Sequence, residues 1–455
     1  MDNQGQKSRS SFSGKVGFVL AAAGSAVGLG NIWRFPYLAA KYGGGTFLLV
    51  YIILAVTFGF ALMITEIAIG RKTRLSAIGA YGALDKRWSF LGKLASAVPM
   101  IIFPYYCVIG GWVTKYLVVF ATGNSAAAAG DTYFTDFIAR PLEPLGWFFL
   151  FIAATAIIVL FGVEKGIEKS SKFLMPILAV LSVVIAIYTC CLPGALEGIK
   201  YYFVPDFSDF SPMVILAALG QLFYSLSLAM GIMITYGSYM KKEVDLEKSV
   251  HQIEIFDVGI ALVAGLMIVP AVFVFSGGKG DAINAGAGLM FITLPKVFDN
   301  MPLSNLVGAC FFLLVLFAAL TSSISLMETV VSILQDKLKW NRKVTCIVVA
   351  VCALLIGVPS SLGHGLWSGF QPLGMSILDF FDFISNSVLM PIIALLTCIF
   401  VAFFIGMDQI TDEVKVSSNF AGEKLYRLIT KYLAPVCIFA ILVSSILNSL
   451  KIIVI

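Results

Sequence analysis

Long apolar runs recur along this chain and are separated by short polar segments. Eleven of these runs approach or exceed the roughly 20 apolar residues that an α-helix needs to cross a bilayer. The pattern predicts an all-α polytopic membrane protein with eleven transmembrane helices. The runs cover residues 14–38, 46–70, 94–122, 145–163, 173–192, 212–240, 248–276, 303–335, 344–358, 377–406 and 432–454.

The composition agrees with a membrane protein and argues against several other classes. Of 455 residues, 59% are hydrophobic and 13% are charged, whereas soluble domains carry about 25% charged residues. The net charge of +5 is spread along the chain without a basic cluster, which argues against a nucleic-acid partner. The eight cysteines form no CxxC pair, and with two histidines they predict neither a zinc or haem site nor a disulfide framework.

Basic residues indicate on which side of the membrane each loop lies. Lys and Arg gather in the amino-terminal tail and in the loops after the even-numbered runs, and few occupy the opposite loops. Because basic loops stay in the cytoplasm, we expect a plasma (inner) membrane protein with a cytoplasmic amino terminus and an extracellular carboxyl terminus. A signal peptide cleaved after residues 21–23 is the alternative, but the run continues through 29–36.

Two of the runs contain small and polar residues near their middle. The first has three glycines between positions 24 and 30, and each costs a helix about 1 kcal/mol relative to alanine. Gly24 and Gly28 also form a GxxxG pattern, which is typical of close helix packing. The sixth run has a similar patch at 220–231, whose serines could simply bond back to the preceding turn.

These two interrupted runs lie five crossings apart. Equivalent elements in the two halves of the chain would therefore run in opposite directions. This spacing predicts an inverted repeat, in which two discontinuous helices expose backbone N–H and carbonyl groups to a central cavity.

Asp257 lies in the seventh run, about ten residues or roughly 15 Å from its inner edge, near the bilayer centre. A carboxylate at this depth costs roughly 3 kcal/mol or more unless it is paired. We favour a cation ligand, with a protonated structural Asp as the alternative. The hydroxyls of Thr321, Ser322 and Ser323 in the eighth run could complete an oxygen cage or cap neighbouring carbonyls.

These segments resemble those of the neurotransmitter:sodium symporters, specifically the bacterial amino-acid members. The resemblance is carried by Gly24-Ser25-Ala26-Val27-Gly28-Leu29-Gly30-Asn31-Ile32-Trp33-Arg34-Phe35-Pro36, by Tyr105-Tyr106, by Gly220-Gln221 through Gly231, and by Leu320-Thr321-Ser322-Ser323. It extends from Arg9 to the eleventh run, and it implies a LeuT-like fold with a 5+5 inverted-repeat core and discontinuous helices 1 and 6.

The same resemblance implies a division of the chain. Residues 1–13 would form a cytoplasmic tail with an inner-gate Arg, and 14–192 the first repeat, which contains helices 1–5. Residues 212–406 would form the second repeat, with helices 6–10, and 432–455 helix 11.

Two sodium ions are implied by the resemblance, each held by backbone and side-chain oxygens. The first would be bound by Ala26, Asn31, Ser225 and Asp257 together with one oxygen of the substrate carboxylate. Sodium and substrate would then favour each other's binding, because such coupling is reciprocal. The second ion would be bound by Gly24, Val27, Ala318, Thr321 and Ser322.

The implied substrate is an amino acid. Tyr106 and the N–H groups of Leu29 and Gly30 would hold its carboxylate at a helix end that favours anions, and Tyr224 with Tyr106 would form a lid. The implied lining residues are Ser25, Ala26, Gly28, Leu29, Gly30, Ile102, Tyr106, Tyr224, Ser225, Ser227, Met230, Ser322 and Leu326. Their lack of charge indicates a neutral, hydrophobic or aromatic amino acid. For the apolar ones, core packing is the alternative interpretation.

The gates follow from the same resemblance. Arg34 and Asp382 resemble the outer gate, with a snorkelling interfacial Arg34 as the alternative. The implied inner gate consists of Arg9, Ser238, Tyr239 and Asp336. Gly166 and Pro176 match a motif in the fifth helix at which local unwinding would admit water to the second sodium ion; an ordinary proline kink is the alternative.

The chain departs from many family members at the first sodium site. Many members have Asn at the position of Asp257 and bind chloride nearby, where this chain has the apolar Ala261. We expect transport to be independent of chloride, because the Asp257 carboxylate supplies the negative charge. The sequence predicts a sodium-coupled symporter that works by alternating access and has no enzymatic activity. The alternative is a sensor of the same fold that binds an amino acid without net transport; the oligomeric state is not indicated.

Overall fold

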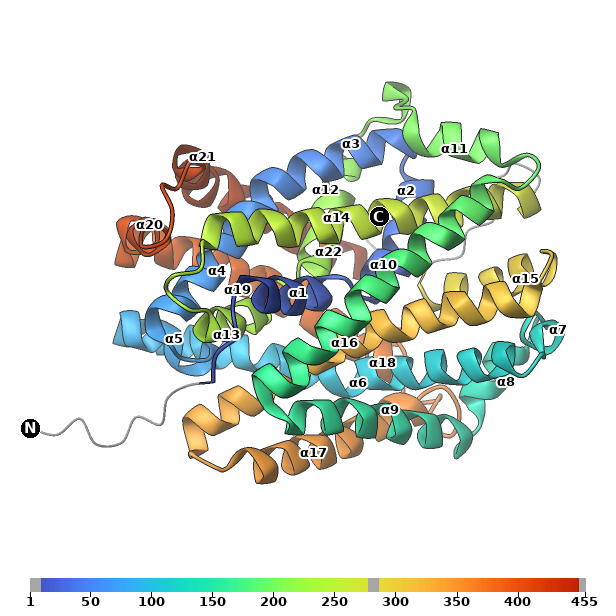
Figure 1. Cartoon of the computed structure of the whole chain (residues 1–455), viewed down its shortest axis with the longest axis horizontal. Coiled ribbons are helices and arrows are strands. Elements are labelled where there is room, and N and C mark those ends of the chain that lie inside the picture. Colours follow the sequence, from blue (N-terminus) through green and yellow to red (C-terminus); the bar gives the residue numbers. More distant parts are fainter. Residues whose placement is uncertain (1–9, 277–285, 450–455) are drawn as a thin grey trace, which may run out of the picture.

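The computed structural model describes residues 10–276 and 286–449, which form a bundle of helices (Figure 1). Within these residues, nine apolar helices are long enough to cross a membrane: Gly45–Thr73, Lys86–Ala121, Glu143–Leu160, Val163–Cys190, Leu246–Phe275, Ser304–Leu338, Arg342–Leu362, Ile377–Ile405 and Glu423–Leu447. A tenth results if Lys15–Ala26 and Gly30–Lys41 count as one span, although they are bent by 52° at a short break. The predicted all-α, multi-pass class is confirmed at the level of nine or ten apolar spans.

The sixth predicted run, 212–240, is divided between two helices. Helix α12 (Pro212–Ser225) has 14 residues and α13 (Ile232–Tyr239) has 8, so neither alone reaches the roughly 20 residues of a membrane span. The count of eleven spans therefore stays a prediction.

The elements occur in the following order. The first third contains α1 (Lys15–Ala26), η1 (Gly30–Arg34), α2 (Phe35–Lys41), α3 (Gly45–Leu54), η2 (Ala55–Gly59), α4 (Phe60–Thr73), α5 (Ala77–Leu84), η3 (Lys86–Trp88), α6 (Ser89–Ala121), α7 (Ser125–Ala128) and α8 (Tyr133–Ala139). The middle contains α9 (Glu143–Leu160), η4 (Val163–Glu168), α10 (Lys169–Cys190), α11 (Ala195–Phe203), η5 (Phe207–Asp209), α12, α13 and α14 (Leu246–Ser276). The last part contains η7 (Leu289–Thr293), α15 (Leu294–Asp299), α16 (Ser304–Leu338), α17 (Arg342–Leu362), η8 (Pro372–Gly374), α18 (Ile377–Asp382), η9 (Phe383–Leu389), α19 (Met390–Ile399), η10 (Phe400–Ile405), α20 (Asp408–Lys415), α21 (Glu423–Leu428), η11 (Ile429–Leu433) and α22 (Ala434–Ser449).

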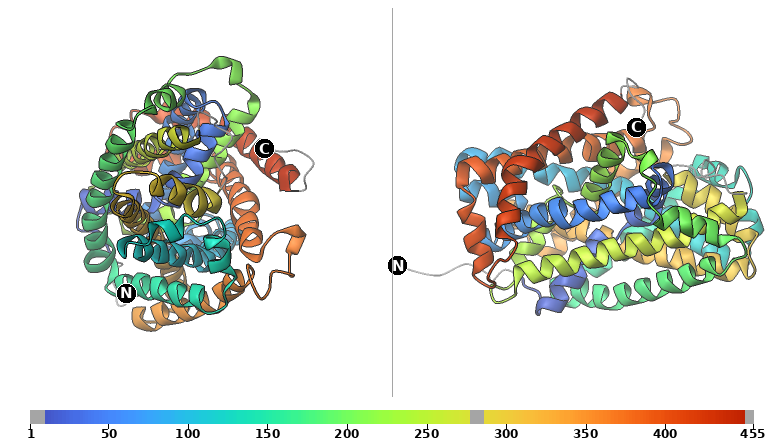
Figure 2. Two further views of the ribbon diagram at one scale, coloured as in Figure 1. Left: turned by 90° about the vertical axis from the view of Figure 1, so that its right-hand side faces the viewer. Right: turned by 90° about the horizontal axis from the view of Figure 1, so that it is seen from above.

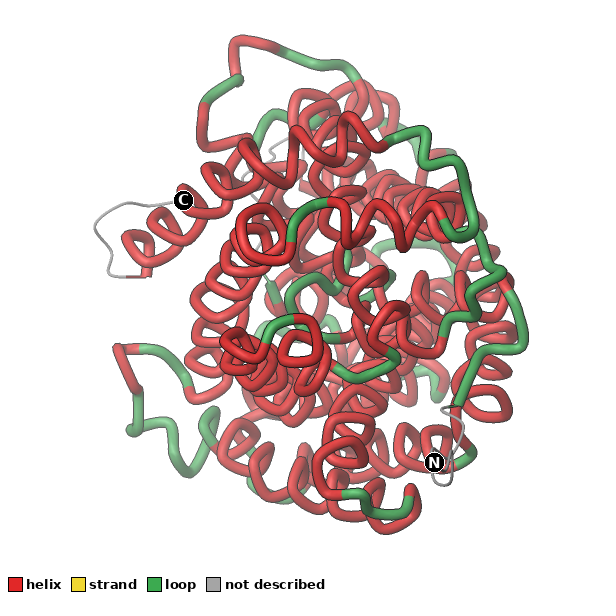
Figure 3. The backbone as a smooth tube through the Cα atoms, turned by 90° about the vertical axis from the view of Figure 1, so that its left-hand side faces the viewer, coloured by secondary structure: helices red, strands yellow, loops and turns green. Residues whose placement is uncertain are grey.

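The long helices lie side by side, roughly along the horizontal direction of Figure 1. Helix α6 packs on α16, and α10 packs on both α14 and α16. The short helix α1 contacts α10, α14 and α16, so it lies inside the bundle. The end-on views in Figure 2 (left) and Figure 3 show this bundle along its length, with most loops joining helices at its ends.

Helices α4 and α13 approach each other without side chains between them. A Cβ atom on Gly70 would lie 1.9 Å from the Ile234 carbonyl oxygen, and one on Gly237 would lie 2.3 Å from the Ile67 carbonyl oxygen. Only glycine fits at either position, because real Cβ contacts are never this short. This reciprocal contact holds α13, the second half of the sixth run, directly on the second span.

The ninth helix is longer than the predicted run, and at its start the reason is local. The ninth run was expected at 344–358, whereas α17 extends from Arg342 to Leu362. The Asn341 side chain accepts a hydrogen bond from the Val344 N–H at 2.9 Å, and such a cap lets the helix begin in polar sequence before the apolar run.

Candidate functional site

The first helix break, at residues 27–29 between α1 and η1, turns carbonyl groups toward the centre of the bundle. Helix α1 ends at Ala26, and the last carbonyls of a helix have no partner within it. The Ser25 carbonyl instead accepts hydrogen bonds from the hydroxyls of Ser227 at 3.0 Å and Ser322 at 3.2 Å. On the other side of the break, the Asn31 side chain accepts the Gly28 N–H at 3.0 Å. Side chains thus replace the missing helical hydrogen bonds.

The second break, at residues 226–231, is supported by a carboxylate from the second span. Ser227 and Ala229 have left-handed φ angles of 53° and 59°, which non-glycine residues rarely adopt. Glu66 on α4 is buried, and its Oε1 accepts the Ala229 N–H at 2.6 Å. Its Oε2 has no hydrogen-bond partner in the part of the chain that the structure describes. The sequence reasoning missed Glu66, although a carboxylate inside the apolar second run was a usable signal.

Asp257 joins both breaks in one buried polar cluster. The Asn31 Nδ2 atom donates to Asp257 Oδ1 at 2.8 Å and lies 3.0 Å from the Ser225 hydroxyl. The Ser225 hydroxyl donates to the two Asp257 carboxylate oxygens at 2.8 and 3.0 Å. The Tyr51 hydroxyl, which the sequence reasoning missed, lies 3.4 Å from Asp257 Oδ2. The structure therefore brings together the three side chains predicted for the first sodium ion. The Ser225 and Asp257 oxygens suit a hard cation, whereas Asn31 turns its Nδ2 atom toward them and its Oδ1 atom toward the Gly28 N–H.

The residues predicted for the second ion also lie together, between α1 and α16. The Thr321 hydroxyl donates to the carbonyls of Phe317 at 3.0 Å and Ala318 at 3.1 Å. A Cβ atom on Gly24 would lie 3.2 Å from Thr321 Cβ. The Ser322 hydroxyl lies 3.5 Å from the Val27 carbonyl oxygen. Hydroxyls and carbonyls from both helices meet here, while their role as sodium ligands stays a prediction.

A small cavity lies beside these clusters. It is lined by all the predicted pocket residues and by Ile232, which was not predicted: Ser25, Ala26, Gly28, Leu29, Gly30, Ile102, Tyr106, Tyr224, Ser225, Ser227, Met230, Ile232, Ser322 and Leu326. The Tyr106 hydroxyl is buried near the Ser322 hydroxyl and the Leu29 N–H, but it forms no hydrogen bond of normal geometry within the described residues. A buried hydroxyl without a partner costs about 1–3 kcal/mol, so it is a candidate ligand-binding group.

Glycines make room for this cavity. A Cβ atom on Gly28 would lie 2.7 Å from the Ser322 hydroxyl oxygen and 3.4 Å from the Tyr106 hydroxyl oxygen. A Cβ atom on Gly30 would lie 2.4 Å from Tyr224 Cδ1. The glycine-rich first break thus lets the Tyr106, Tyr224 and Ser322 side chains reach the backbone of residues 28–30.

The predicted outer-gate residues lie close to the cavity but form no direct ion pair in the described part of the chain. The Arg34 guanidinium lies over the Tyr224 ring, 5.4 Å from its centroid. The Asp382 carboxylate accepts hydrogen bonds from the Tyr105 hydroxyl at 3.0 Å and the Asn386 side chain at 2.6 Å. The carboxylate and the guanidinium each have another partner in this structure.

The predicted inner-gate residues lie around α13. The Tyr239 hydroxyl donates to buried Glu328 at 2.7 Å, and the Ser238 hydroxyl donates to the Thr235 carbonyl at 2.5 Å. Asp336 Oδ2 accepts the Ser76 N–H at 2.7 Å. Arg9, the fourth predicted member, lies outside the described residues.

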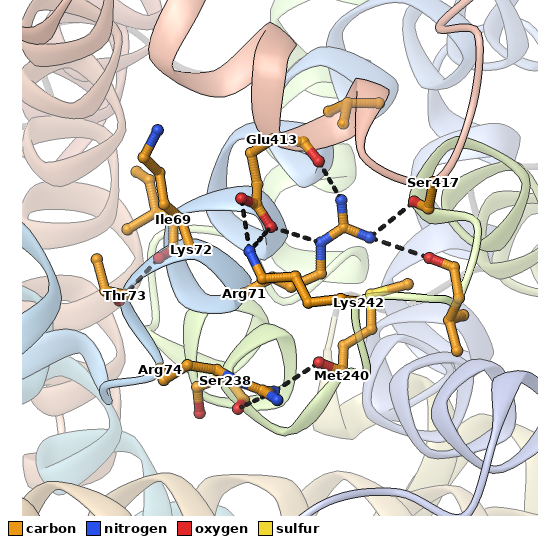
Figure 4. A network of polar contacts seen from close by, with 12 residues as sticks. Ile69, Arg71, Lys72, Thr73, Arg74, Ser238, Met240, Lys242, Glu413 and Ser417 are labelled. Atoms are coloured by element: carbon orange, nitrogen blue, oxygen red, sulfur yellow. Dashed lines mark hydrogen bonds and ion pairs between the residues drawn. The ribbon is translucent and has the colours of Figure 1, made fainter. Parts of the chain in front are cut away.

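A network of polar contacts supports the same end of α13 (Figure 4). Arg74 donates to the carbonyls of Ser238 at 3.1 Å and Met240 at 2.7 Å. Arg71 and Lys242 both contact the Glu413 carboxylate, at 2.9 and 2.6 Å. This network ties the end of α4 to the segment after α13 and to α20.

The fifth span is helical at the place where unwinding was predicted. Gly166 lies in the π-helical turn η4, and Pro176 lies inside the continuous helix α10. The predicted unwinding is therefore not present in this conformation. Pro176 removes one backbone donor, but the turns on both sides remain helical.

Taken together, the apolar helices and the small cavity beside buried polar clusters, between two helix breaks, define a multi-pass membrane transporter. Residues 9–137 and 144–453 match the model of the sodium:neurotransmitter symporter family. The chain belongs to this family, which confirms the resemblance seen in its motifs, and it is a transporter rather than an enzyme.

Similar proteins agree with this assignment. An uncharacterized sodium-dependent transporter, YhdH of Bacillus subtilis, is 35% identical over 443 residues, which cover 96% of this chain and 97% of the relative. The sodium- and chloride-dependent GABA transporter 2 of Rattus norvegicus is 26% identical over 499 residues, 98% of this chain and 81% of the relative. The crystal structure of MhsT in complex with L-phenylalanine has a TM-score of 0.86 and 39% identity, and the match covers 96% of this chain and 100% of that one.

The contact of Glu66 with the second break leads to a prediction. Glu66→Ala leaves the Ala229 N–H without an acceptor in a dry interior, which costs about 1–3 kcal/mol. We expect faster hydrogen–deuterium exchange at residues 226–231 and a lower thermal midpoint, with a smaller effect for Glu66→Gln, which keeps an acceptor oxygen. Glu197→Ala, at an exposed position on α11, is the control. Unchanged exchange in Glu66→Ala contradicts the supporting role.

Proposed function

We propose that the protein is a sodium-coupled symporter that imports a neutral, hydrophobic or aromatic amino acid by alternating access. The observation that carries this proposal is the cavity between two helix breaks, beside the Asp257 cluster. Ala26 and Ser225 belong to both the cavity and the predicted first sodium site. An ion and a cargo that share these residues would stabilise each other's binding.

The lining of the cavity supports the choice of cargo. The Tyr106 hydroxyl lacks a partner within the described residues, and it lies near the start of the helix formed by Gly30–Lys41. A carboxylate suits both groups, since helix starts favour anions. Ile102, Met230 and Leu326 supply an apolar wall, and no charged side chain lines the described cavity. The L-phenylalanine complex of the similar MhsT supports the same class of cargo.

Two sodium ions are proposed to drive this import. Asn31, Ser225 and Asp257 would hold the first ion with the Ala26 carbonyl. The second would join α1 to α16 through Thr321 and Ser322 with the carbonyls of Gly24, Val27 and Ala318. A dehydrated hard cation needs about six oxygens, and helix breaks supply carbonyl oxygens without adding charge.

The transport cycle is proposed to use the gates on either side of the cavity. With the outer side open, sodium and amino acid would bind, and Tyr106, Tyr224, Arg34 and Asp382 would close over them. Separation of Arg9 from Asp336 would then open the inner side, in a plasma membrane protein whose amino terminus is cytoplasmic. The two helix breaks would be discontinuities of spans 1 and 6 within two inverted repeats, 14–192 and 212–406.

Chloride has no part in this proposal. The Asp257 carboxylate lies where it can balance the sodium charge, and it accepts hydrogen bonds from Asn31 and Ser225. Ala261 is buried and brings no polar side chain to the neighbourhood.

Uptake into proteoliposomes tests the main proposal. With an inward sodium gradient, we expect accumulation of at least one hydrophobic or aromatic member of the twenty amino acids, and none with potassium in place of sodium. Asp257→Ala should abolish accumulation because it removes the buried anionic ligand. Sodium-dependent binding without accumulation in the wild type would instead favour the sensor.

A second test concerns chloride. Replacing chloride with gluconate should leave the initial sodium-driven uptake rate unchanged in the wild type. Asp257→Asn should make uptake partly dependent on chloride, since a mobile anion could then supply the missing charge. A large loss of wild-type uptake in gluconate contradicts the proposed role of the carboxylate.

Gly28 provides a third test. Gly28→Ala places a methyl group 2.7 Å from the Ser322 hydroxyl oxygen and narrows the cavity, so we expect at least a tenfold weaker apparent affinity for the transported amino acid. Gly146→Ala, where a Cβ atom meets nothing within 4 Å, is the control. Equal affinity in both variants would show that the cargo does not reach residue 28.

A further inference from the structure

Glu168 makes a contact to α1 that the predicted gates do not include. Its side chain is buried, and its carboxylate lies at the first turn of α1. Glu168 Oε2 accepts the Ser13 N–H at 2.8 Å, and Oε1 accepts the Ser13 hydroxyl. Lys172, one turn later in the same span, donates to Oε1 at 2.6 Å. Two residues 155 positions apart are thus joined by two hydrogen bonds.

Gly17 allows this carboxylate to lie directly against the α1 backbone. A Cβ atom on Gly17 would be 2.2 Å from Glu168 Cδ and 2.3 and 2.6 Å from its two oxygens. Any side chain at position 17 would therefore displace the carboxylate. Helix α1 has no side-chain cap of its own at Gly14, and a negative charge at a helix start is favourable. Glu168 brings such a charge to the first turn of α1 from another span and accepts the Ser13 N–H just before the helix.

The backbone that carries Glu168 is irregular. Glu168 is the last residue of the π-helical turn η4, which follows Gly162 with a left-handed φ of 87°. Single π-helical turns within helices often occur at functional sites. Glu168 thus lies where this π-helical turn meets α10, whose Lys172 also contacts the carboxylate.

We propose that Glu168 is a positioning residue that latches the start of α1 to the fifth span and must release it before the inner side of the transporter opens. The proposal rests on the alternating-access function proposed above. The latch acts at the first turn of α1, whereas the predicted second sodium site lies near its last turn. Sodium and the latch therefore hold opposite ends of one short helix in the closed position.

Hydrogen–deuterium exchange of the full-length protein in lipid nanodiscs tests the latch without any cargo. In Glu168→Gln, the charge is lost and one acceptor weakens, so amides 15–24 should exchange at least tenfold faster than in the wild type. The sodium concentration at which these amides reach half of their maximal protection from exchange should rise at least threefold. Glu164→Gln, an exposed position in the same turn, is the matched control and should stay within twofold.

Gly17→Ala gives an independent test of the same contact. Alanine favours a helix by about 1 kcal/mol over glycine, so without a latch this substitution should slow exchange in α1. We expect faster exchange instead, because the methyl group displaces the carboxylate. The double variant should exchange within about twofold of either single variant, since both act on one contact. Additive effects, or slower exchange in Gly17→Ala, would overturn the proposal.

Two further comparisons distinguish the latch from a general loss of stability and from the transport proposal. Exchange in α16 should be unchanged in both variants, and faster exchange there as well would mean that Glu168 is merely structural. The exchange result does not depend on uptake. A protein that binds an amino acid without accumulating it would still show the latch. Unchanged exchange in α1 of Glu168→Gln would contradict the latch even if uptake is demonstrated.

Discussion

Peptide groups exposed inside a dry helical bundle need partners, and this constraint shapes the centre of the molecule. Each helix break removes backbone hydrogen bonds where no water is available to replace them. The structure supplies side chains from distant elements: the Ser227 and Ser322 hydroxyls on the Ser25 carbonyl, Asn31 on the Gly28 N–H, and Glu66 on the Ala229 N–H. Without these contacts the peptide groups at the breaks would be left unpaired in the interior, which is costly.

The same hydrogen bonds explain why ion and cargo chemistry occur side by side. Oxygens directed at the centre of the bundle can serve a cation, and N–H groups at a helix start can serve a carboxylate. Ser225 belongs to both groups, because its hydroxyl contacts Asp257 and its residue lines the cavity. In the proposed function, ion and cargo would therefore meet at Ser225.

The sequence predicts those features that depend on local pattern or on motif resemblance. Apolar runs indicate the spans. The motifs that resemble the family predicted every residue that lines the cavity except Ile232. Contacts between distant positions leave no local trace: Glu168 with Ser13 and Gly70 with Ile234 emerge only when the helices are packed. For Glu66 the sequence shows a carboxylate in an apolar run but not its Ala229 partner. Hydropathy also does not predict where helices end, because a cap such as Asn341 lets α17 begin in polar sequence. The Arg34–Asp382 pair depends on conformation, and no sequence pattern specifies which conformation a structure shows.

The backbone contact between α4 and α13 has a mechanical consequence. Side chains between helices normally absorb small sliding motions by changing rotamer, but Gly70 and Gly237 leave no such layer. Arg74 adds hydrogen bonds from the end of α4 to the end of α13. A movement of α13 would therefore carry α4, and with it the span Gly45–Thr73, as one rigid unit.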